Sequence, residues 1–408
     1  MTLAIRARRL LDVRTGGFIE NPVVTVEGER IASVGSPPPA GATVLDWGDR
    51  ILLPGLIDAH THVLLQGNLS RADYHHQILR EYPAHRVARA VRSLGIALGH
   101  GFTFLRDLET EGAGYADVAL RDAVSEGVLP GPRMQVAGPA LSTTGTYPIL
   151  RYRPDWEFPV GVQIVDGADS GRRAVRQQLS YGTDWVKVYA NMGAGHAVTA
   201  DGYIDSPSNF TLPELSAVVE ESHAHGSRVA AHATSDRGIR VALDAGVDSI
   251  EHGYSIRPEV AAEMAARGVF LSPTFTATDY VAQARAKERG LVWSEAPRIQ
   301  VRSFENCLAA GVRIAFGTDV GGFPWTDIHQ AKEFTFLTRF GMSPIDAIRS
   351  ATVVSAELLH VEGEVGIIEA GAYADLIGVR DNPLDDISAL ERVDRVMKGG
   401  VVVRQPAL

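Results

Sequence analysis

Residues 53–62 read LPGLIDAHTH, and this stretch decides the fold. A short apolar run is typical of a buried β-strand, and successive side chains on a strand alternate between its two faces. His60 and His62 therefore point to the same side, where two neighbouring imidazoles can bind a metal ion. An isolated His-x-His pair also arises by coincidence. The rest of the chain has to decide between these two readings.

Lys187 is the second unusual residue, because it interrupts the apolar run DWVKVY at residues 184–189. The chain has four lysines against 35 arginines, so a lysine inside a strand needs a cause. Burying an unpaired ammonium is costly, and lysine, unlike arginine, can become neutral. A neutral amine reacts with carbon dioxide to give a carbamate, which is an anionic, bidentate metal ligand.

Three more candidates follow short apolar runs: His232, His252 and Asp319. A lone histidine of this kind is more often a satisfied core residue than a ligand. Here, however, every candidate lies at or near the end of a separate β-type run or is paired on one. We therefore interpret them, with His60, His62 and Lys187, as parts of one site.

Apolar, β-branched runs alternate with amphipathic helical segments along most of the chain. The predicted strands cover residues 56–62, 102–107, 133–138, 185–190, 228–232, 249–252, 269–274 and 313–317. The predicted helices include residues 84–100, 168–181, 213–225, 236–245, 258–267 and 295–310, and several end before a glycine that can cap them: Gly182, Gly226, Gly246, Gly268 and Gly311. Eight such units predict an α/β fold, the (β/α)8 TIM barrel, in which reactive groups come from the C-terminal ends of the strands.

The two ends of the chain lie outside this pattern. Residues 1–54 and 362–408 read as short alternating strands with turns, for example at residues 3–7, 23–27, 31–35, 366–368 and 374–379. Because chain termini often lie close together, we expect both segments to form one small, discontinuous β-sandwich. The barrel domain then covers residues 55–361.

These motifs resemble the amidohydrolase superfamily of metal-dependent hydrolases over essentially the whole chain. The resemblance implies that two divalent metal ions are bound by a strand-one His-x-His pair, a carboxylated strand-four lysine, two further histidines and a strand-eight aspartate. In this sequence these are His60, His62, Lys187, His232, His252 and Asp319. The segments GVLPGPR at 127–133, WVKVY at 185–189 and IEHG at 250–253 are similar to the branch of Xaa-Pro and Xaa-Arg dipeptidases, N-acyl amino acid hydrolases and ochratoxin amidases.

The ligand set implies the chemistry. His60, His62 and Asp319 would hold the more buried metal, His232 and His252 the more exposed one, and carboxylated Lys187 would bridge them. A hydroxide bridging the two ions attacks the amide carbonyl, and Asp319 is the expected general base and then general acid. Zinc is the default expectation, although manganese, cobalt or iron fit the same ligands.

Substrate contacts are expected from the loops after the strands. Tyr189 follows Lys187 on its strand, and His196 lies in the glycine-rich loop beyond it. Tyr147 lies in the loop 141–162, whose aromatic residues are suited to walling a pocket. The dipeptidases tend to carry a Gly-Gly-His stretch near this point, which TGTY at residues 144–147 replaces. We also expect residues 321–325, GGFPW, at the pocket rim, the loop 63–83 at the solvated surface, and Arg106 and Asp107 in a structural ion pair rather than in catalysis.

Composition limits the other classes of function. The net charge of −10 gives no basic surface for nucleic acid, and the 45% hydrophobic content contains no 18-residue apolar span, so we expect no membrane partner. The single cysteine, Cys307, excludes an intrachain disulfide framework and is expected to be an inert core residue. No cleavable leader is visible, which favours a cytoplasmic protein, although a leader removed from the precursor is compatible with the sequence. A homo-oligomer is compatible with the helical exterior.

Three functions remain open at this point. The first is cleavage of the amide bond of a dipeptide, an N-acyl amino acid or an ochratoxin-like N-aroyl amino acid. The second keeps the metals and changes the bond to a lactone, a carbamate or a cyclic amide. The third is a non-catalytic scaffold of the same fold, whose signature would be missing ligands.

Overall fold

Two all-parallel sheets form the centre of the computed structural model, which describes residues 2–35, 37–67, 71–147, 155, 158–191, 197–289 and 291–404. The first has the order β10-β9-β8, and the second has the order β12-β11-β13-β16-β17-β18. Their strands are β8 (Leu56–Thr61), β9 (Phe102–Asp107), β10 (Arg133–Val136), β11 (Leu141–Ser142), β12 (Gln163–Ile164), β13 (Trp185–Tyr189), β16 (Arg228–Ala233), β17 (Ser249–His252) and β18 (Phe270–Ser272). Every residue of β8, β9, β13 and β17 is buried, as expected for parallel strands covered on both faces.

The register of these strands brings their C-terminal ends to one level. Tyr189 on β13 pairs with His232 on β16, and Ala233 pairs with His252 on β17. Side chains near the ends of different strands therefore meet at the same edge of the sheet.

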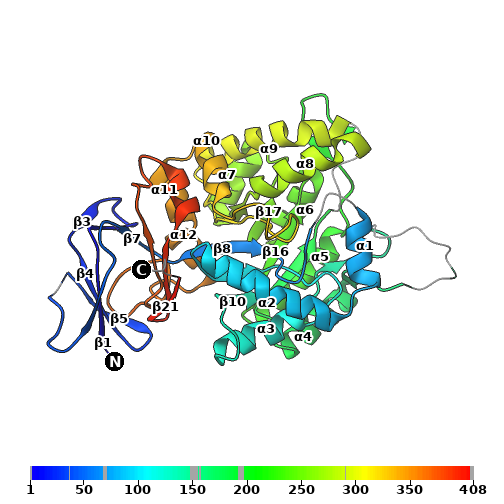
Figure 1. Cartoon of the computed structure of the whole chain (residues 1–408). Coiled ribbons are helices and arrows are strands. Elements are labelled where there is room, and N and C mark those ends of the chain that lie inside the picture. The colour runs from blue at the N-terminus through cyan, green and yellow to red at the C-terminus, as the bar shows by residue number, and fades with distance from the viewer. Residues whose placement is uncertain are drawn as a thin grey trace.

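Helices surround the two sheets (Figure 1). They are α1 (Arg71–Leu79), α2 (Pro83–Gly99), α3 (Ala116–Ser125), α4 (Ala168–Ser180), α5 (Leu212–Ala224), α6 (Asp236–Ala245), α7 (Pro258–Arg267), α8 (Phe275–Arg289), α9 (Leu291–Ala310), α10 (Lys332–Arg339), α11 (Pro344–Ser350), α12 (Val353–Leu359) and the 3-10 helix η1 (Ile387–Arg392). The predicted glycine caps are confirmed, because all five glycines adopt a positive φ, from 71° at Gly268 to 92° at Gly182. None of the helices in the described parts of the chain is long and apolar enough to cross a membrane.

The predicted strand at 313–317 is wrong, because this segment forms only isolated bridges. Ile314 bridges Leu271 of β18, and Val320 bridges Thr61 of β8. The ladder breaks at Phe316, whose backbone N–H donates to the main-chain oxygen of Ser350, the last residue of α11, instead of to a neighbouring strand. The segment still lies between β18 and β8, and its irregular backbone carries Asp319.

Two other expectations are corrected. The loop 63–83 contains helix α1, and residues 366–368 form bends rather than a strand.

The terminal segments of the chain meet in a separate pair of sheets (Figure 1). One sheet has the order β5-β4-β1-β6 and contains β1 (Thr2–Arg6), β4 (Val23–Glu27), β5 (Arg30–Val34) and β6 (Thr43–Asp46). The other has the order β21-β20-β19-β7-β2-β3 and contains β2 (Arg9–Leu11), β3 (Phe18–Glu20), β7 (Ile51–Pro54), β19 (Leu376–Val379), β20 (Arg395–Lys398) and β21 (Val401–Arg404). A common apolar cluster that includes Ile5, Trp47, Leu376 and Met397 joins residues from both ends of the chain.

Candidate active site

The histidines predicted from the sequence converge at the C-terminal edge of the parallel strands. Their imidazole rings follow one another, with centroid distances of 5.3 Å from His62 to His60, 5.0 Å from His60 to His252 and 4.5 Å from His252 to His232. His60 lies on β8 and His62 directly after it, whereas His232 lies on β16 and His252 ends β17. Three segments that are far apart in sequence or belong to different strands thus supply one continuous group of imidazoles.

Asp319 completes a compact group with His60 and His62. The potential ligand atoms of these three residues all lie within 4.8 Å of one another. Oδ1 of Asp319 is 3.0 Å from Nε2 of His62 and 3.7 Å from Nε2 of His60. Burial opposes the charged form of His62, but the hydrogen bond and the negative charge of Asp319 outweigh it and raise the pKa of His62. Two imidazoles and a carboxylate at this spacing fit one divalent metal ion.

Lys187 lies buried among these residues, with 1% of its surface exposed. Burial lowers the pKa of its ammonium, opposed by the negative charges of Glu251, Glu109 and Asp319. In turn, the charge of Lys187 adds to burial in lowering the pKa of His232 to about 3. Within the described residues the ammonium has neither a hydrogen bond nor an ion pair. These surroundings favour the neutral amine, which is the form that reacts with carbon dioxide.

His60 is held by a buried chain of charged groups. Its Nδ1 lies 2.7 Å from Oε2 of Glu251, whose Oε1 accepts a hydrogen bond of 2.8 Å from Arg106. Glu251 and Arg106 are fully buried, and Arg106 also stacks on Trp185 at 4.4 Å. Because a carboxylate only accepts, this contact places the proton of His60 on Nδ1 and leaves the lone pair of Nε2 for a metal. The expected structural ion pair is confirmed for Arg106, with Glu251 as its partner. Within the described residues it is not found for Asp107, whose carboxylate accepts hydrogen bonds from Thr61 and from the N–H of Val63 instead.

His252 is fixed by its backbone and by two neighbours. Its Nδ1 lies 2.8 Å from Oγ1 of Thr274, and its main-chain oxygen accepts a hydrogen bond of 3.2 Å from Gln300. Both His252 and Thr274 have left-handed backbones, with φ of 71° and 56°. Such backbones cost energy in residues other than glycine and are held by the surrounding structure, which is common at functional sites.

Residues 321–325 pack against the main chain of His62, and their expected place at a pocket rim stays a prediction. Phe323 and Trp325 are buried, and Nε1 of Trp325 donates a hydrogen bond of 3.2 Å to the main-chain oxygen of His62. A Cβ at Gly321, where φ is 104°, would lie 2.3 Å from the same oxygen. This segment therefore supports the backbone of His62.

Two tyrosines extend the row of rings beyond His232. The ring of Tyr189 is 4.9 Å from His232, and the ring of Tyr147 is 5.4 Å from Tyr189. The hydroxyl of Tyr147 donates a hydrogen bond to Glu111, which lies near Glu109 on the loop after β9. Tyr147 and Tyr189 thus line the side of the group next to His232.

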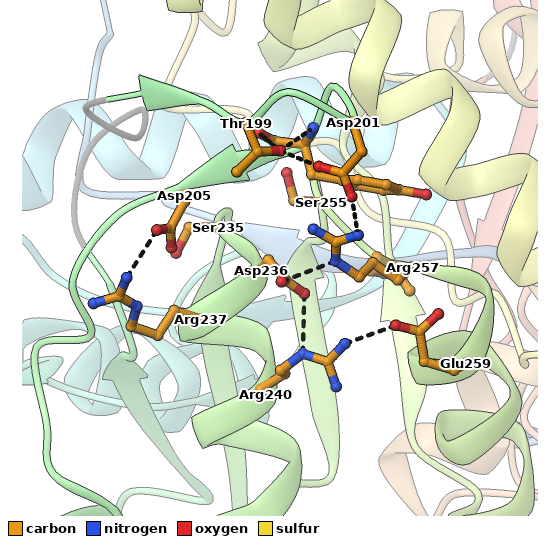
Figure 2. A network of polar contacts seen from close by, with 12 residues as sticks. Thr199, Asp201, Asp205, Ser235, Asp236, Arg237, Arg240, Ser255, Arg257 and Glu259 are labelled. Atoms are coloured by element: carbon orange, nitrogen blue, oxygen red, sulfur yellow. Dashed lines mark hydrogen bonds and ion pairs between the residues drawn. The ribbon is translucent and has the colours of Figure 1, made fainter.

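The segment after β13 leads into the short hairpin of β14 (Ala197–Val198) and β15 (Ile204–Asp205), whereas the predicted contact His196 lies outside the described residues. Figure 2 shows how ion pairs tie the hairpin to the body of the protein. Arg257 pairs with Asp201 at the hairpin turn and, at 2.9 Å, with Asp236 at the start of α6. The hairpin is thereby anchored beside the site.

Glu251, Glu109 and Glu111 were not among the predicted site residues. Glu251 stands next to His252 in the sequence, and an acidic residue beside a predicted ligand is a usable signal. Glu109 and Glu111 follow the end of the predicted strand 102–107, just as the predicted ligands follow theirs. Two acidic residues in the loop directly after a buried strand are therefore a similar signal of a site.

The donor atoms of the site fit divalent metal ions. Nε2 of His60 and Nε2 of His232 are buried and have no hydrogen-bond partner among the described residues. Burial keeps both imidazoles neutral by lowering their pKa, so both nitrogens offer lone pairs. Neutral imidazoles and a carboxylate are ligands that zinc and similar metals prefer.

Comparisons with known proteins agree with this site. The chain matches the model of the amidohydrolase family over residues 51–403. It is 30% identical to the ochratoxinase of Aspergillus niger over 387 residues, covering 88% of this chain and 76% of the relative. A solved Xaa-Pro dipeptidase with methionine bound in its active site is similar at 32% identity and a TM-score of 0.87, covering 99% of this chain and 100% of the other. A prolidase complexed with N-methylphosphonate-L-proline has 29% identity and a TM-score of 0.86 over the full length of both chains. These matches extend over both the parallel sheets and the terminal segments, so the chain belongs to the amidohydrolase family and is a hydrolase that acts on amide or peptide bonds.

Proposed function

We propose that this protein uses two divalent metal ions to cleave the amide bond of a dipeptide or of an N-acyl or N-aroyl amino acid. The observation that carries the proposal is the compact group of His60, His62 and Asp319 beside the buried Lys187. The similar Xaa-Pro dipeptidase, prolidase and ochratoxinase support the class of substrate.

We assign the residues as follows. His60, His62 and Asp319 would hold one metal ion, His232 and His252 the other, and carboxylated Lys187 would lie between them. When bound, the metals polarise the substrate carbonyl and lower the pKa of a water molecule towards ~7. Zinc is the expected ion.

The chain's own groups have complementary tasks. Oδ1 of Asp319 accepts a proton from the attacking water and delivers it to the leaving amine. Glu251 holds the tautomer of His60, and Tyr189, Tyr147 and His196 would contact the substrate. The remaining carbonyl and carboxylate groups of the substrate are hydrogen-bond acceptors that suit the tyrosine hydroxyls.

The architecture is part of the same proposal. The hydrogen bond from the N–H of Asp184, just before β13, to the oxygen of Val136 on β10 links the two parallel sheets at one side, and residues 313–320 link them at the other. We therefore infer a closed (β/α)8 barrel for residues 55–361. Residues 1–54 and 362–408 would form a β-sandwich around their common apolar cluster.

Metal analysis tests the function directly. Protein supplied with zinc and bicarbonate is expected to contain about two zinc ions per chain and to hydrolyse members of a panel of dipeptides, N-acyl amino acids and aryl amides. Lys187→Ala should lose both metal and activity, whereas Lys332→Ala, at the start of α10, should keep both. A wild-type protein without stoichiometric metal, or a Lys187→Ala variant with unchanged metal and activity, would refute the proposal. A panel of lactones, carbamates and cyclic amides separates the alternative substrates.

A further inference from the structure

Glu109 and Glu111 form a buried acidic pair on the loop between β9 and α3. Their exposed fractions are 0% and 4%. The main-chain oxygen of Glu109 lies 3.4 Å from Nδ1 of His62, so the loop packs directly against the proposed metal ligands. This pair is therefore part of the site's wall rather than of the distant core.

The two carboxylates differ in their partners. Glu111 accepts a hydrogen bond from the hydroxyl of Tyr147. Both carboxylate oxygens of Glu109 are buried, and neither has a hydrogen-bond partner in the part of the chain that the structure describes. A buried carboxylate without a partner costs several kcal/mol, so a group of this kind is expected to be completed by a ligand.

Among the described residues, no guanidinium or ammonium donates a hydrogen bond to the carboxylate of Glu109. The nearby guanidinium of Arg86 donates to main-chain oxygens, at 2.7 Å to Glu111 and Thr110 and at 3.1 Å to Leu64. The carboxyl of Glu109 interacts with the hydroxyl of Tyr189 and with the ammonium of Lys187, while burial and the neighbouring Glu111 raise its pKa well above the usual value, so a bound cation would stabilise the charged form. Carboxylation of Lys187 would turn its ammonium into an anion. The need of Glu109 for a positively charged partner then increases.

We propose that Glu109, supported by Glu111 and Tyr147, binds the protonated α-amine of the substrate residue that contributes the scissile carbonyl. The inference rests on the proposed function and narrows its substrate class to dipeptides with a free N-terminus. In such a dipeptide a single carbon atom separates the ammonium from the carbonyl carbon. The ammonium must therefore lie beside the metal ligands, where the main chain of Glu109 contacts His62 and its carboxyl interacts with Tyr189. An N-acyl or N-aroyl amino acid would place a neutral, apolar group against the same unpaired carboxylate.

Three substrates with one scissile bond test this assignment: methionyl-proline, N-acetyl-methionyl-proline and the analogue in which hydrogen replaces the amine. Wild type should prefer the free dipeptide. Glu109→Gln should lower kcat/KM for the free dipeptide roughly tenfold to a hundredfold, the range for a lost charge-assisted contact, and should leave the other two within about threefold. Tyr147→Phe should give a smaller loss with the same selectivity, and Glu126→Gln, an exposed carboxylate just after α3, should change nothing.

The outcomes separate the two proposals. Equal losses on all three substrates, or loss of bound zinc in Glu109→Gln, would assign Glu109 to the metal or to the fold and overturn the inference. A wild-type preference for the N-acetylated substrate would overturn it while leaving amide hydrolysis intact. Hydrolysis of no amide at all would overturn the proposed function and the inference that rests on it.

Discussion

Nδ1 of His60 lies 2.7 Å from Oε2 of Glu251, and the two residues are separated by 191 positions in the sequence. The contact connects the end of β8 to β17 and sets the tautomer of a proposed metal ligand. Arg106 balances the charge of Glu251 from β9. The proposed metal centre therefore depends on a second layer of buried charges.

Replacing Glu251 should weaken metal binding. Glu251→Gln keeps the shape but removes the acceptor charge that orients His60 and balances Arg106. Loss of such an outer partner typically lowers metal affinity by about 10- to 100-fold, which competition with a zinc chelator measures. Glu357→Gln, from an ion pair with Arg313 that is 38–44% exposed, is the matched control and should keep the wild-type affinity. An unchanged affinity in Glu251→Gln would show that His60 is oriented without it.

Asp319 should be needed for both metal binding and proton transfer. Asp319→Asn keeps one oxygen ligand but cannot accept the proton, so kcat should fall by roughly 10²- to 10⁴-fold even when metal is resupplied. Activity is compared at equal metal content with Asp327→Asn, an exposed aspartate of the following loop. A metal-loaded Asp319→Asn enzyme with near-normal kcat would remove Asp319 from the proton-transfer role.

Gly321 should tolerate no side chain. In Gly321→Ala the new Cβ would meet the main-chain oxygen of His62 at 2.3 Å, and the backbone has a φ of 104°. We expect a loss of stability of ~1–3 kcal/mol together with a loss of bound metal. Gly363→Ala shares the positive φ, 79°, but its Cβ would meet nothing within 4 Å. Denaturant unfolding and metal analysis of both variants separate backbone strain from displacement of His62, and equal metal content in the two would contradict the expected displacement.

A stacked histidine pair away from the site should make stability depend on pH. The rings of His100 and His329 are 3.6 Å apart, and burial is the largest cause that lowers their pKa, to about 4 for His100 and about 3 for His329. The charge of Arg404 adds to this at both residues, and the charge of His100 adds to it at His329. The folded pKa values lie below the unfolded value of about 6.5, so the unfolded chain binds protons more readily in acid. The stabilising contribution is complete above pH 6.5 and decreases as the pH falls towards the folded values.

The double variant His100→Gln, His329→Asn isolates this contribution. Asparagine retains an acceptor for the N–H of Ala331, which His329 Nδ1 accepts at 3.1 Å in the wild type. The free energy of unfolding of the wild type should fall relative to that of the variant between pH 7 and pH 5, as urea titrations measure. Parallel pH curves for the two proteins would refute the assignment.

The sequence by itself determined the elements and the candidate ligands. Alternating apolar runs, helical segments and glycine caps are local properties, and seven of the eight predicted strands are present within a few residues of their expected bounds. The pattern of His60, His62, Lys187, His232, His252 and Asp319 is visible because each residue interrupts or ends an apolar run. Such interruptions can be read without knowing which segments touch.

Only the tertiary structure decided what surrounds those ligands. The break in the strand at 313–317 follows from the hydrogen bond between Phe316 and Ser350, which a local pattern cannot encode. Residues 321–325 pack against the backbone of His62, because Gly321 lets the two backbones approach closely. Arg106 and Glu251 become partners, and the carboxylate oxygens of Glu109 are left without a hydrogen-bond partner among the described residues, only when distant strands are brought to the same edge of the sheet. Burial there makes an isolated charge costly. This desolvation cost distinguishes the supporting and substrate-facing residues from ordinary surface charges.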